Sequence, residues 1–179
     1  MDLGDIKSIL SSEIDPKLDT TDFKHAAVLI VIYGDKPHLI MTEKPENMKL
    51  HAREISFPGG KYEQHDSDLL ETAIRETREE IGLIIDRDQV IGQLEPVVTL
   101  NSGFMILPFV AVINEIKFLA TNPEVKKILH IPFVSFLKTL REDTMTNGEK
   151  DMYVLIHQGK VVWGASARML KQISDRLKI

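Results

Sequence analysis

Glu76, Glu79 and Glu80 are the residues in this chain whose type and spacing could do chemistry. Positions i, i+3 and i+4 of a helix lie on one side, so three carboxylates placed there repel one another. They also fall in the last two turns of the predicted helix, where the helix dipole favours cations. A hard divalent cation such as Mg²⁺ takes oxygen ligands and keeps waters that a phosphate can displace. Such an ion would turn the repulsion into a binding site.

A solvated helix face without a metal is the alternative interpretation. Arg75 and Arg78 would then compensate the glutamates, and Glu71 and Glu79 each stand four residues from Arg75. Opposite charges at this spacing stabilise a helix. The helix sequence alone leaves both interpretations open.

The segment from residue 56 to residue 83 must position these carboxylates. A helix is predicted from apolar residues that recur every three or four positions, and Gly82 is suited to end it. Its apolar face consists of Leu70, Ala73, Ile74, Thr77 and Ile81. Residues 56–60 (Ser-Phe-Pro-Gly-Gly) indicate a strand that runs into a glycine turn, and Asp66 is predicted to cap the helix. A strand, a glycine loop and an acidic helix together suit a site for phosphate and metal.

The same residues resemble the Nudix box, written G-x5-E-x7-R-E-U-x-E-E-x-G-U, in which U is a bulky apolar residue. The matching positions are Gly60, Arg75, Glu76, Glu79, Glu80, Gly82 and Leu83. Asp66 best matches the first glutamate of the box, and Thr77 replaces an apolar residue. The interval from Gly60 to Arg75 is one residue longer than in the general box, as in the coenzyme A pyrophosphatase branch of the family.

Three further segments resemble that branch, so the resemblance covers roughly Ala26 to Leu170. The pattern L-L-T-x-R-(S/A)-x3-R-x3-G-x3-F-P-G-G is met with Lys44 and Lys49 in place of arginines and Arg53 in place of a glycine. Residues 95–110 fit E-P-x-x-T-x-x-S-G-x-x-V-x-P-F-V, and residues 163–168 fit W-G-A-(T/S)-A-R. Lysine keeps the charge of arginine but lacks its planar fork for two-point phosphate contacts.

The resemblance implies an α/β fold, an α/β/α sandwich with a mixed sheet between the box helix and the C-terminal helix. It also implies a diphosphate hydrolase that splits coenzyme A or its acyl derivatives into 3′,5′-ADP and 4′-phosphopantetheine. Glu76, Glu79 and Glu80 would bind Mg²⁺ or Mn²⁺, which would neutralise the diphosphate and position a water. Arg75 would orient a glutamate of the cluster. Glu79, Glu80 and Glu124 are the candidates for the general base.

Substrate binding is predicted to involve residues around the Phe-Pro-Gly-Gly segment. Lys44, Lys49 and Arg53 would supply charge-assisted donors to phosphate oxygens, although each also suits an ordinary solvated loop. Gly59 and Gly60 would let backbone amides approach the substrate or fix the start of the helix. ADP-ribose or a dinucleotide stays open as an alternative substrate because of the lysine and arginine changes. A sensor that binds a nucleotide without cleaving it is a further alternative, but it would not need all three glutamates.

Composition limits the remaining possibilities. A chain of 179 residues with 43% apolar content is predicted to form one core, with residues 1–22 as a helical extension and 23–179 as the hydrolase domain. The net charge of −5 argues against non-specific binding to nucleic acid, and the absence of cysteine excludes disulfides and thiolate sites. No signal peptide or membrane-spanning run is visible, so we expect a cytoplasmic protein without a membrane partner. Apolar strand edges and the N-terminal helix are candidate contacts of a homodimer.

The other elements follow from local patterns. Helices are predicted over residues 2–12 and 133–140, and a last helix opens with residues 162–168 and runs to about residue 177. Strands are predicted over 25–33, 38–42, 89–100, 104–113, 151–157 and 160–163. Pro108 implies that the strand over residues 104–113 lies at an edge or carries a bulge. Trp163 is predicted in the core, with a role as a stacking platform for a ligand as the alternative.

Overall fold

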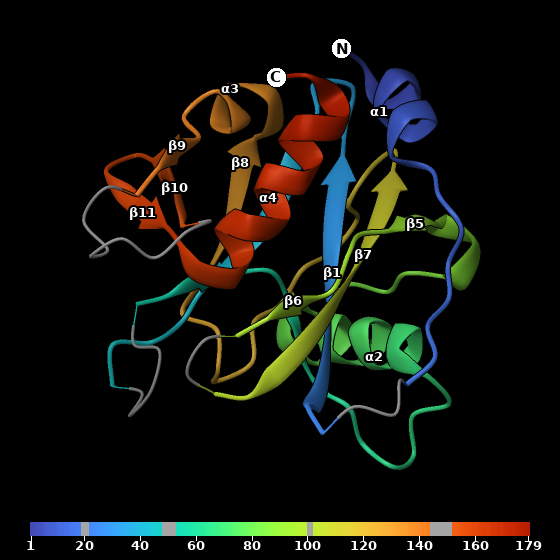
Figure 1. Ribbon diagram of the computed structural model, residues 1–179. Helices are drawn as coiled ribbons and strands as arrows, with labels where there is room; N and C mark the ends of the chain where they lie inside the picture. The colour runs from blue at the N-terminus through green and yellow to red at the C-terminus, as the bar shows by residue number, and fades with distance from the viewer. Residues whose placement is uncertain (19–21, 48–52, 100–101, 144–151) are drawn as a thin grey trace.

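The computed structural model describes residues 1–18, 22–47, 53–99, 102–143 and 152–179 (Figure 1). Eight strands form its main sheet: β1 (Lys24–Tyr33), β2 (His38–Glu43), β3 (Ile55–Ser56), β4 (Gly59–Lys61), β5 (Val90–Gln93), β6 (Val97–Val98), β7 (Phe104–Ile113) and β8 (Lys127–Pro132). The order is β3-β2-β1-β7-β5, with β4 paired to β1, β6 to β7 and β8 to β2. A smaller sheet contains β9 (Arg141–Glu142), β10 (Tyr153–His157) and β11 (Lys160–Val162).

Strand β1 is the centre of the main sheet. Its β-branched, apolar sequence suits a strand that is buried on both faces, and most of its residues are buried. It runs parallel to β7 along its whole length, from Lys24 opposite Phe104 to Tyr33 opposite Ile113. It forms an antiparallel hairpin with β2, in which Ile32 lies opposite Leu39. The sheet is therefore mixed, as predicted.

Helices cover both faces of this sheet. They are α1 (Leu3–Leu10), α2 (Leu69–Ile81), α3 (Phe133–Leu137) and α4 (Gly164–Leu177), and a short 3-10 helix spans Arg87–Gln89. Figure 1 shows α4 in front of the sheet and α2 behind it. Successive residues of a strand point to opposite faces, so Leu29 belongs to the core under α2 and Ile30 to the core under α4. The predicted α/β/α sandwich is confirmed.

Helix α1 confirms the prediction for the N-terminal segment. The Asp2 side chain accepts a hydrogen bond from the Asp5 backbone at 2.9 Å, and Asp5 returns one to the Asp2 backbone. This reciprocal cap satisfies backbone N–H groups that the helix leaves open. Ile6 and Leu10 are fully buried in the core under α4.

Within the described ranges, no helix is long and apolar enough to cross a membrane.

Pro108 lies in the interior of the sheet, so of the two predicted settings, an edge or a bulge, the edge is wrong. A register irregularity does lie nearby, where Val90 and Gly92 of β5 face Ala111 and Val110 of β7. Strand β7 stands between β1 on one side and β5 and β6 on the other. A proline removes one hydrogen bond from a sheet, and here it faces a break between two short strands. Strand β5 ends with Gln93 opposite Phe109, and β6 begins with Val97 opposite Ile106.

Trp163 is 51% exposed, so its predicted place in the core is wrong. It follows β11 and serves as the residue before the first turn of α4. The strand buries Val162 and exposes its neighbours, because successive side chains point to opposite sides. The predicted hairpin itself is confirmed, with Leu155 of β10 opposite Val162 of β11.

Candidate active site

Helix α2 starts two residues later than predicted. Its N-cap is Asp68, whose side chain accepts a hydrogen bond from the Glu71 backbone at 2.8 Å, so the assignment of Asp66 as the cap is wrong. At the other end Gly82 adopts a left-handed conformation, with φ of 67°, and closes the helix as predicted. The three glutamates therefore lie in the last turns of α2, the end at which a helix attracts cations.

Asp66 instead forms a buried ion pair with Arg75. The two residues are 3% and 6% exposed, respectively. Arg75 donates from Nε to Oδ1 of Asp66 at 2.8 Å and from a terminal nitrogen to Oδ2 at 3.0 Å, a two-point contact. The Thr72 hydroxyl donates to the same carboxylate at 2.9 Å. Hydrogen bonds from Arg75 lower the pKa of Asp66 to about 2, so this carboxylate stays charged.

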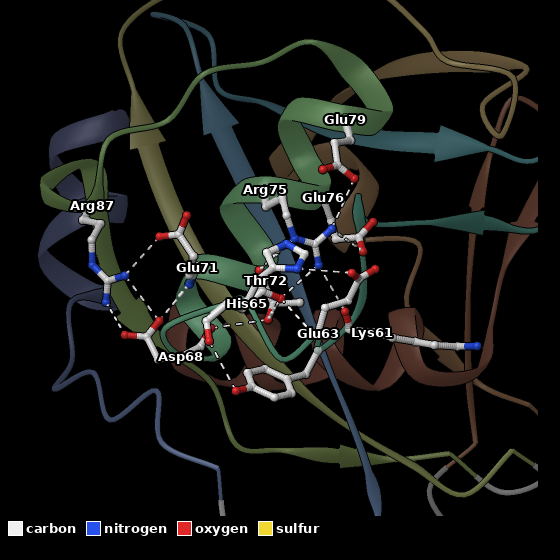
Figure 2. Close-up of polar contacts among 12 residues, drawn as sticks. Lys61, Glu63, His65, Asp68, Glu71, Thr72, Arg75, Glu76, Glu79 and Arg87 are labelled. Atoms are coloured by element: carbon white, nitrogen blue, oxygen red, sulfur yellow. Dashed lines mark hydrogen bonds and ion pairs between the residues drawn. The ribbon is translucent and has the colours of Figure 1, made fainter.

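The same guanidinium also holds two of the three glutamates (Figure 2). Its other terminal nitrogen donates to Glu76 at 3.0 Å and to Glu79 at 3.2 Å, and the remaining donor binds the Lys61 carbonyl at 3.2 Å. An arginine has five N–H donors, and each has an acceptor here. Arg75 thereby links the acidic end of α2 to strand β4.

Glu80, the third glutamate, is 4% exposed and does not share the Arg75 contact in the described hydrogen bonds. It accepts a hydrogen bond from the Gly59 backbone at 3.2 Å. Burial raises the pKa of Glu80 to about 7, and the charge of Lys44 opposes that rise. Burial also raises the pKa of Glu76. The charge of Glu124 further raises the pKa of both glutamates, so the fold brings Glu124 into electrostatic range of the cluster.

Gly59 and Gly60 lie in strand β4 and pair with Val28 and Ala27 of β1, so the predicted glycine turn is wrong. A Cβ atom at Gly60 would lie 2.4 Å from Cδ of Glu76. A Cβ atom at Gly59 would lie 2.3 Å from the Ala27 carbonyl oxygen, and the φ of +153° there is open to glycine but strained for other residues. The first glycine makes room for the sheet backbone, and the second makes room for a glutamate.

Alanine at these two positions should therefore have different effects. Gly60→Ala pushes only the end of a flexible side chain, so we expect a loss of stability below about 1 kcal/mol but a fall in activity of about 10- to 100-fold, because Glu76 is displaced. Gly59→Ala pushes backbone atoms and adds strain, so we expect a loss of about 2–4 kcal/mol. Thermal unfolding and turnover of both variants would test this. Equal loss of stability in the two variants would contradict it.

A divalent cation fits this site by its donor chemistry. As the side chains stand, no three acidic or histidine side chains in the described part of the chain converge closely enough to hold a metal ion. Arg75 engages Glu76 and Glu79, while the Gly59 amide engages Glu80. Nevertheless, these glutamates supply several carboxylate oxygens, the donors that Mg²⁺ and Mn²⁺ prefer. Their mutual repulsion is relieved by a cation.

The predicted substrate-binding cations have different surroundings. Lys44 lies at the end of β2, its backbone N–H donates to the Glu54 carbonyl at 3.0 Å, and its charge acts on Glu80. Arg53 is exposed and forms an ion pair with Glu46 at 3.0 Å. Lys49 lies outside the described residues. Of the three, Lys44 is the one that the structure relates to the glutamates.

Glu43 is a buried carboxylate that the sequence patterns missed. It is 4% exposed and binds Nζ of Lys160 at 2.6 Å, and Nζ of Lys126 lies at 3.9 Å. The contact with Lys160 joins β2 to the hairpin that leads into α4, whereas Lys126 directly precedes β8. Because residues 43 and 160 are far apart in the chain, no local spacing could have indicated this pair.

The chain also resembles known proteins in sequence and in structure. A protein of Yersinia enterocolitica described as "Uncharacterized Nudix hydrolase NudL" is 32% identical over 161 residues, which make up 87% of this chain and 82% of that protein. The crystal structure of a MutT/nudix family protein from Enterococcus faecalis matches with a TM-score of 0.65 and 13% identity, over 93% of this chain. This chain spans 65% of that protein, less than two thirds of its length.

A third similar protein is the NUDIX domain of Shewanella oneidensis NrtR, solved in complex with ADP ribose. It matches with a TM-score of 0.61 and 13% identity, over 92% of this chain and 94% of that one. At such identities the two structural matches show the fold alone. A family model described as "NUDIX domain" matches residues 23–151, which include the whole acidic end of α2. Together with the 32% identity to the Yersinia protein, this match shows that the chain belongs to the Nudix hydrolase family.

Proposed function

We propose that this protein hydrolyses the diphosphate linkage of coenzyme A or its acyl derivatives to 3′,5′-ADP and 4′-phosphopantetheine. The observation that carries the proposal is the carboxylate cluster at the end of α2. There, Arg75 is anchored on Asp66 and holds Glu76 and Glu79, while Glu80 lies against the Gly59 amide. Buried, crowded carboxylates of this kind mark a site for a cation and a polyanion.

Nudix hydrolases generally use divalent metal ions, and Glu76, Glu79 and Glu80 would hold Mg²⁺ or Mn²⁺ in this protein. When bound, the ion supplies positive charge to the diphosphate and lowers the pKa of water. The Glu79 side chain is 52% exposed, so it has room to exchange its contact with Arg75 for an ion. The buried Asp66–Arg75 pair would keep the other ligands in place during that exchange.

The chain itself would contribute positive groups and a proton acceptor. A diphosphate resists hydrolysis because its negative charge repels nucleophiles. Lys44 and the Gly59 amide would offer donors to the phosphate oxygens. Glu79, Glu80 and Glu124 are the candidates to accept a proton from the attacking water. The water oxygen bonds to one phosphorus as the bridging P–O bond breaks, which leaves a phosphate on each product.

ADP-ribose or a dinucleotide is the second candidate for the substrate. Arg53 binds Glu46, and Lys44 lacks the planar fork with which arginine holds a phosphate in two-point contact. Both features weaken the specific likeness to coenzyme A pyrophosphatases. The similar Shewanella NrtR domain was solved in complex with ADP ribose.

Product analysis by chromatography would test the proposal. The pure protein is incubated with Mg²⁺ or Mn²⁺ and, separately, with coenzyme A, ADP-ribose, NADH and a diadenosine polyphosphate. We expect coenzyme A to be cleaved fastest, to 3′,5′-ADP and 4′-phosphopantetheine. If another compound is cleaved faster, the proposed diphosphate hydrolysis stands, but coenzyme A is not the preferred substrate. Binding of a nucleotide without cleavage of any would refute the hydrolase and favour a sensor.

The Glu79→Gln variant should separate an enzyme from a sensor. The change keeps the size of the side chain and its hydrogen bond from Arg75, so we expect an unchanged unfolding temperature. Turnover should fall by about 100-fold or more, because a ligand and possible base is neutralised. Calorimetry would show whether nucleotide affinity without metal is retained. Unchanged turnover would remove Glu79 from the catalytic group.

A further inference from the structure

Two lysines meet over one aromatic ring at the start of β1 and β7. Nζ of Lys24 lies 5.7 Å from the centre of the Phe104 ring, and Nζ of Lys61 lies 5.6 Å from it. The negative face of an aromatic ring attracts ammonium groups at such distances. Both lysines are exposed and Phe104 is half-buried, so two cations lie within cation–π range of one ring at the surface.

The register of three strands creates this arrangement. Lys24 of β1 lies opposite Phe104 of β7, and Ala26 of β1 lies opposite Lys61 of β4. Residues two apart on a strand share a face, so these side chains all stand on one face of the sheet. Ala26 lies opposite Lys61 on one side and Ile106 on the other, and its small side chain occupies little of this face.

Neither ammonium is neutralised within the part of the chain that the structure describes. No carboxylate there forms an ion pair with Lys24 or Lys61, whereas Lys126, Lys160 and Arg87 each have at least one. Two ammonium groups near one ring, without a carboxylate partner, make the surface potential there positive, so an anion would be favoured. This is notable in a chain whose net charge is −5.

The lysine pair is directly connected to the carboxylate cluster. Lys61 follows Gly60, and its carbonyl accepts the hydrogen bond from Arg75. Figure 2 shows the Lys61 side chain extending away from the glutamates. In the described residues, β4 pairs with β1 alone and its other edge carries no strand. A substrate whose diphosphate lies at Gly59 and Gly60 can therefore pass over that edge toward Lys61.

We propose that Lys24 and Lys61, which both lie near the Phe104 ring, bind a phosphate monoester that the substrate carries outside its diphosphate. This proposal rests on the proposed function, and it names the residues that would select the substrate. A monoester carries up to two charges and three terminal oxygens, so it can accept charge-assisted hydrogen bonds from two ammonium groups. Coenzyme A has such a group and dephospho-coenzyme A lacks it. The lysines therefore favour coenzyme A.

The kinetic test compares kcat/KM for these two compounds in the wild type, in Lys24→Gln, in Lys61→Gln and in the double variant. We expect the wild type to prefer coenzyme A by about 10-fold or more, the size of one or two charge-assisted contacts. In the double variant the two rates should agree within about threefold, with dephospho-coenzyme A cleaved as before. Lys117→Gln, an exposed lysine paired with Glu115, is the matched control. An unchanged preference in the double variant would overturn the inference.

A binding test gives the same answer without turnover. Calorimetry compares 3′,5′-ADP with 5′-AMP in the absence of metal, and unfolding temperatures confirm that each variant is folded. The wild type should bind 3′,5′-ADP more tightly, and the double variant should bind both alike. Equal binding by the wild type overturns the inference whatever the substrate. If the lysines select 3′,5′-ADP but no diphosphate is cleaved, the proposed function fails and the anion site stands.

Discussion

The Glu80→Gln variant is expected to lose activity by about 1,000-fold or more and to unfold at a higher temperature than the wild type in metal-free buffer at pH 8. Glu80 is 4% exposed. The hydrogen bond that it accepts from the Gly59 amide can be made equally to a glutamine carbonyl. The substitution therefore removes a buried charge while it keeps the shape. A gain in stability together with a loss of function is typical of a site whose charge serves catalysis.

The sign of this effect depends on pH. Burial raises the pKa of Glu80 from an ordinary value of 4.5 to about 7, so the unfolded chain loses this proton at lower pH than the folded protein does. The contribution of Glu80 to the stability of the metal-free wild type therefore falls as the pH rises from 4.5 to about 7 and is then constant. The variant lacks this loss. Its advantage in unfolding free energy should be near zero at pH 4.5 and reach about 1–3 kcal/mol above pH 7.

Denaturant unfolding at several pH values, with and without Mg²⁺, would measure both effects. Mg²⁺ should stabilise the wild type more than the variant, because the ion favours an ionised Glu80. Glu71→Gln is the matched control: it makes the same change on the same helix, at a side chain that is 44% exposed. A Glu80→Gln variant that is less stable than the wild type at pH 8 would contradict the electrostatic account.

Local patterns were sufficient to predict α2 and its end at Gly82. The apolar residues recur at the spacing of a helix, and a glycine after them is favoured by its left-handed conformation. The α/β/α layers followed from the family resemblance together with the buried, apolar sequence of β1. The helix and the buried strand depend on residues that are close together in the sequence, so both could be predicted without a structure.

Contacts between distant segments could not be predicted in the same way. Asp66 is of a residue type that often caps a helix, but its side chain accepts hydrogen bonds from Arg75 instead. Trp163 has a large apolar side chain of the kind often found in a core, but the hairpin buries Val162 instead. The lysine pair on Phe104 depends on the register of three strands. In each case the deciding partner comes from a part of the chain that no spacing rule connects.

The Asp66–Arg75 pair should be the most costly to break. Asp66→Ala leaves a buried guanidinium without its main partner, so we expect a loss of about 3–5 kcal/mol in unfolding free energy. Arg75→Met should also release Glu76 and Glu79 and lower activity by about 100-fold or more. The low pKa of Asp66 also predicts how the stabilisation by this pair depends on pH in acid. Its stabilisation is complete above pH 3.8 and is lost as the pH falls toward 2.

A double-mutant cycle would isolate the energy of the interaction between Asp66 and Arg75. The more exposed ion pair between Arg87 and Asp68 serves as the comparison. Arg87 binds Asp68 at 2.6 Å, but these side chains are 46% and 21% exposed, compared with 7% and 0% for Arg75 and Asp66 (Figure 2). We expect a coupling energy of at least about 2 kcal/mol for the buried pair and below about 1 kcal/mol for the other. Equal coupling in both pairs would show that burial does not strengthen the contact. It would also remove the reason for Arg75 to act as the fixed support of the carboxylate cluster.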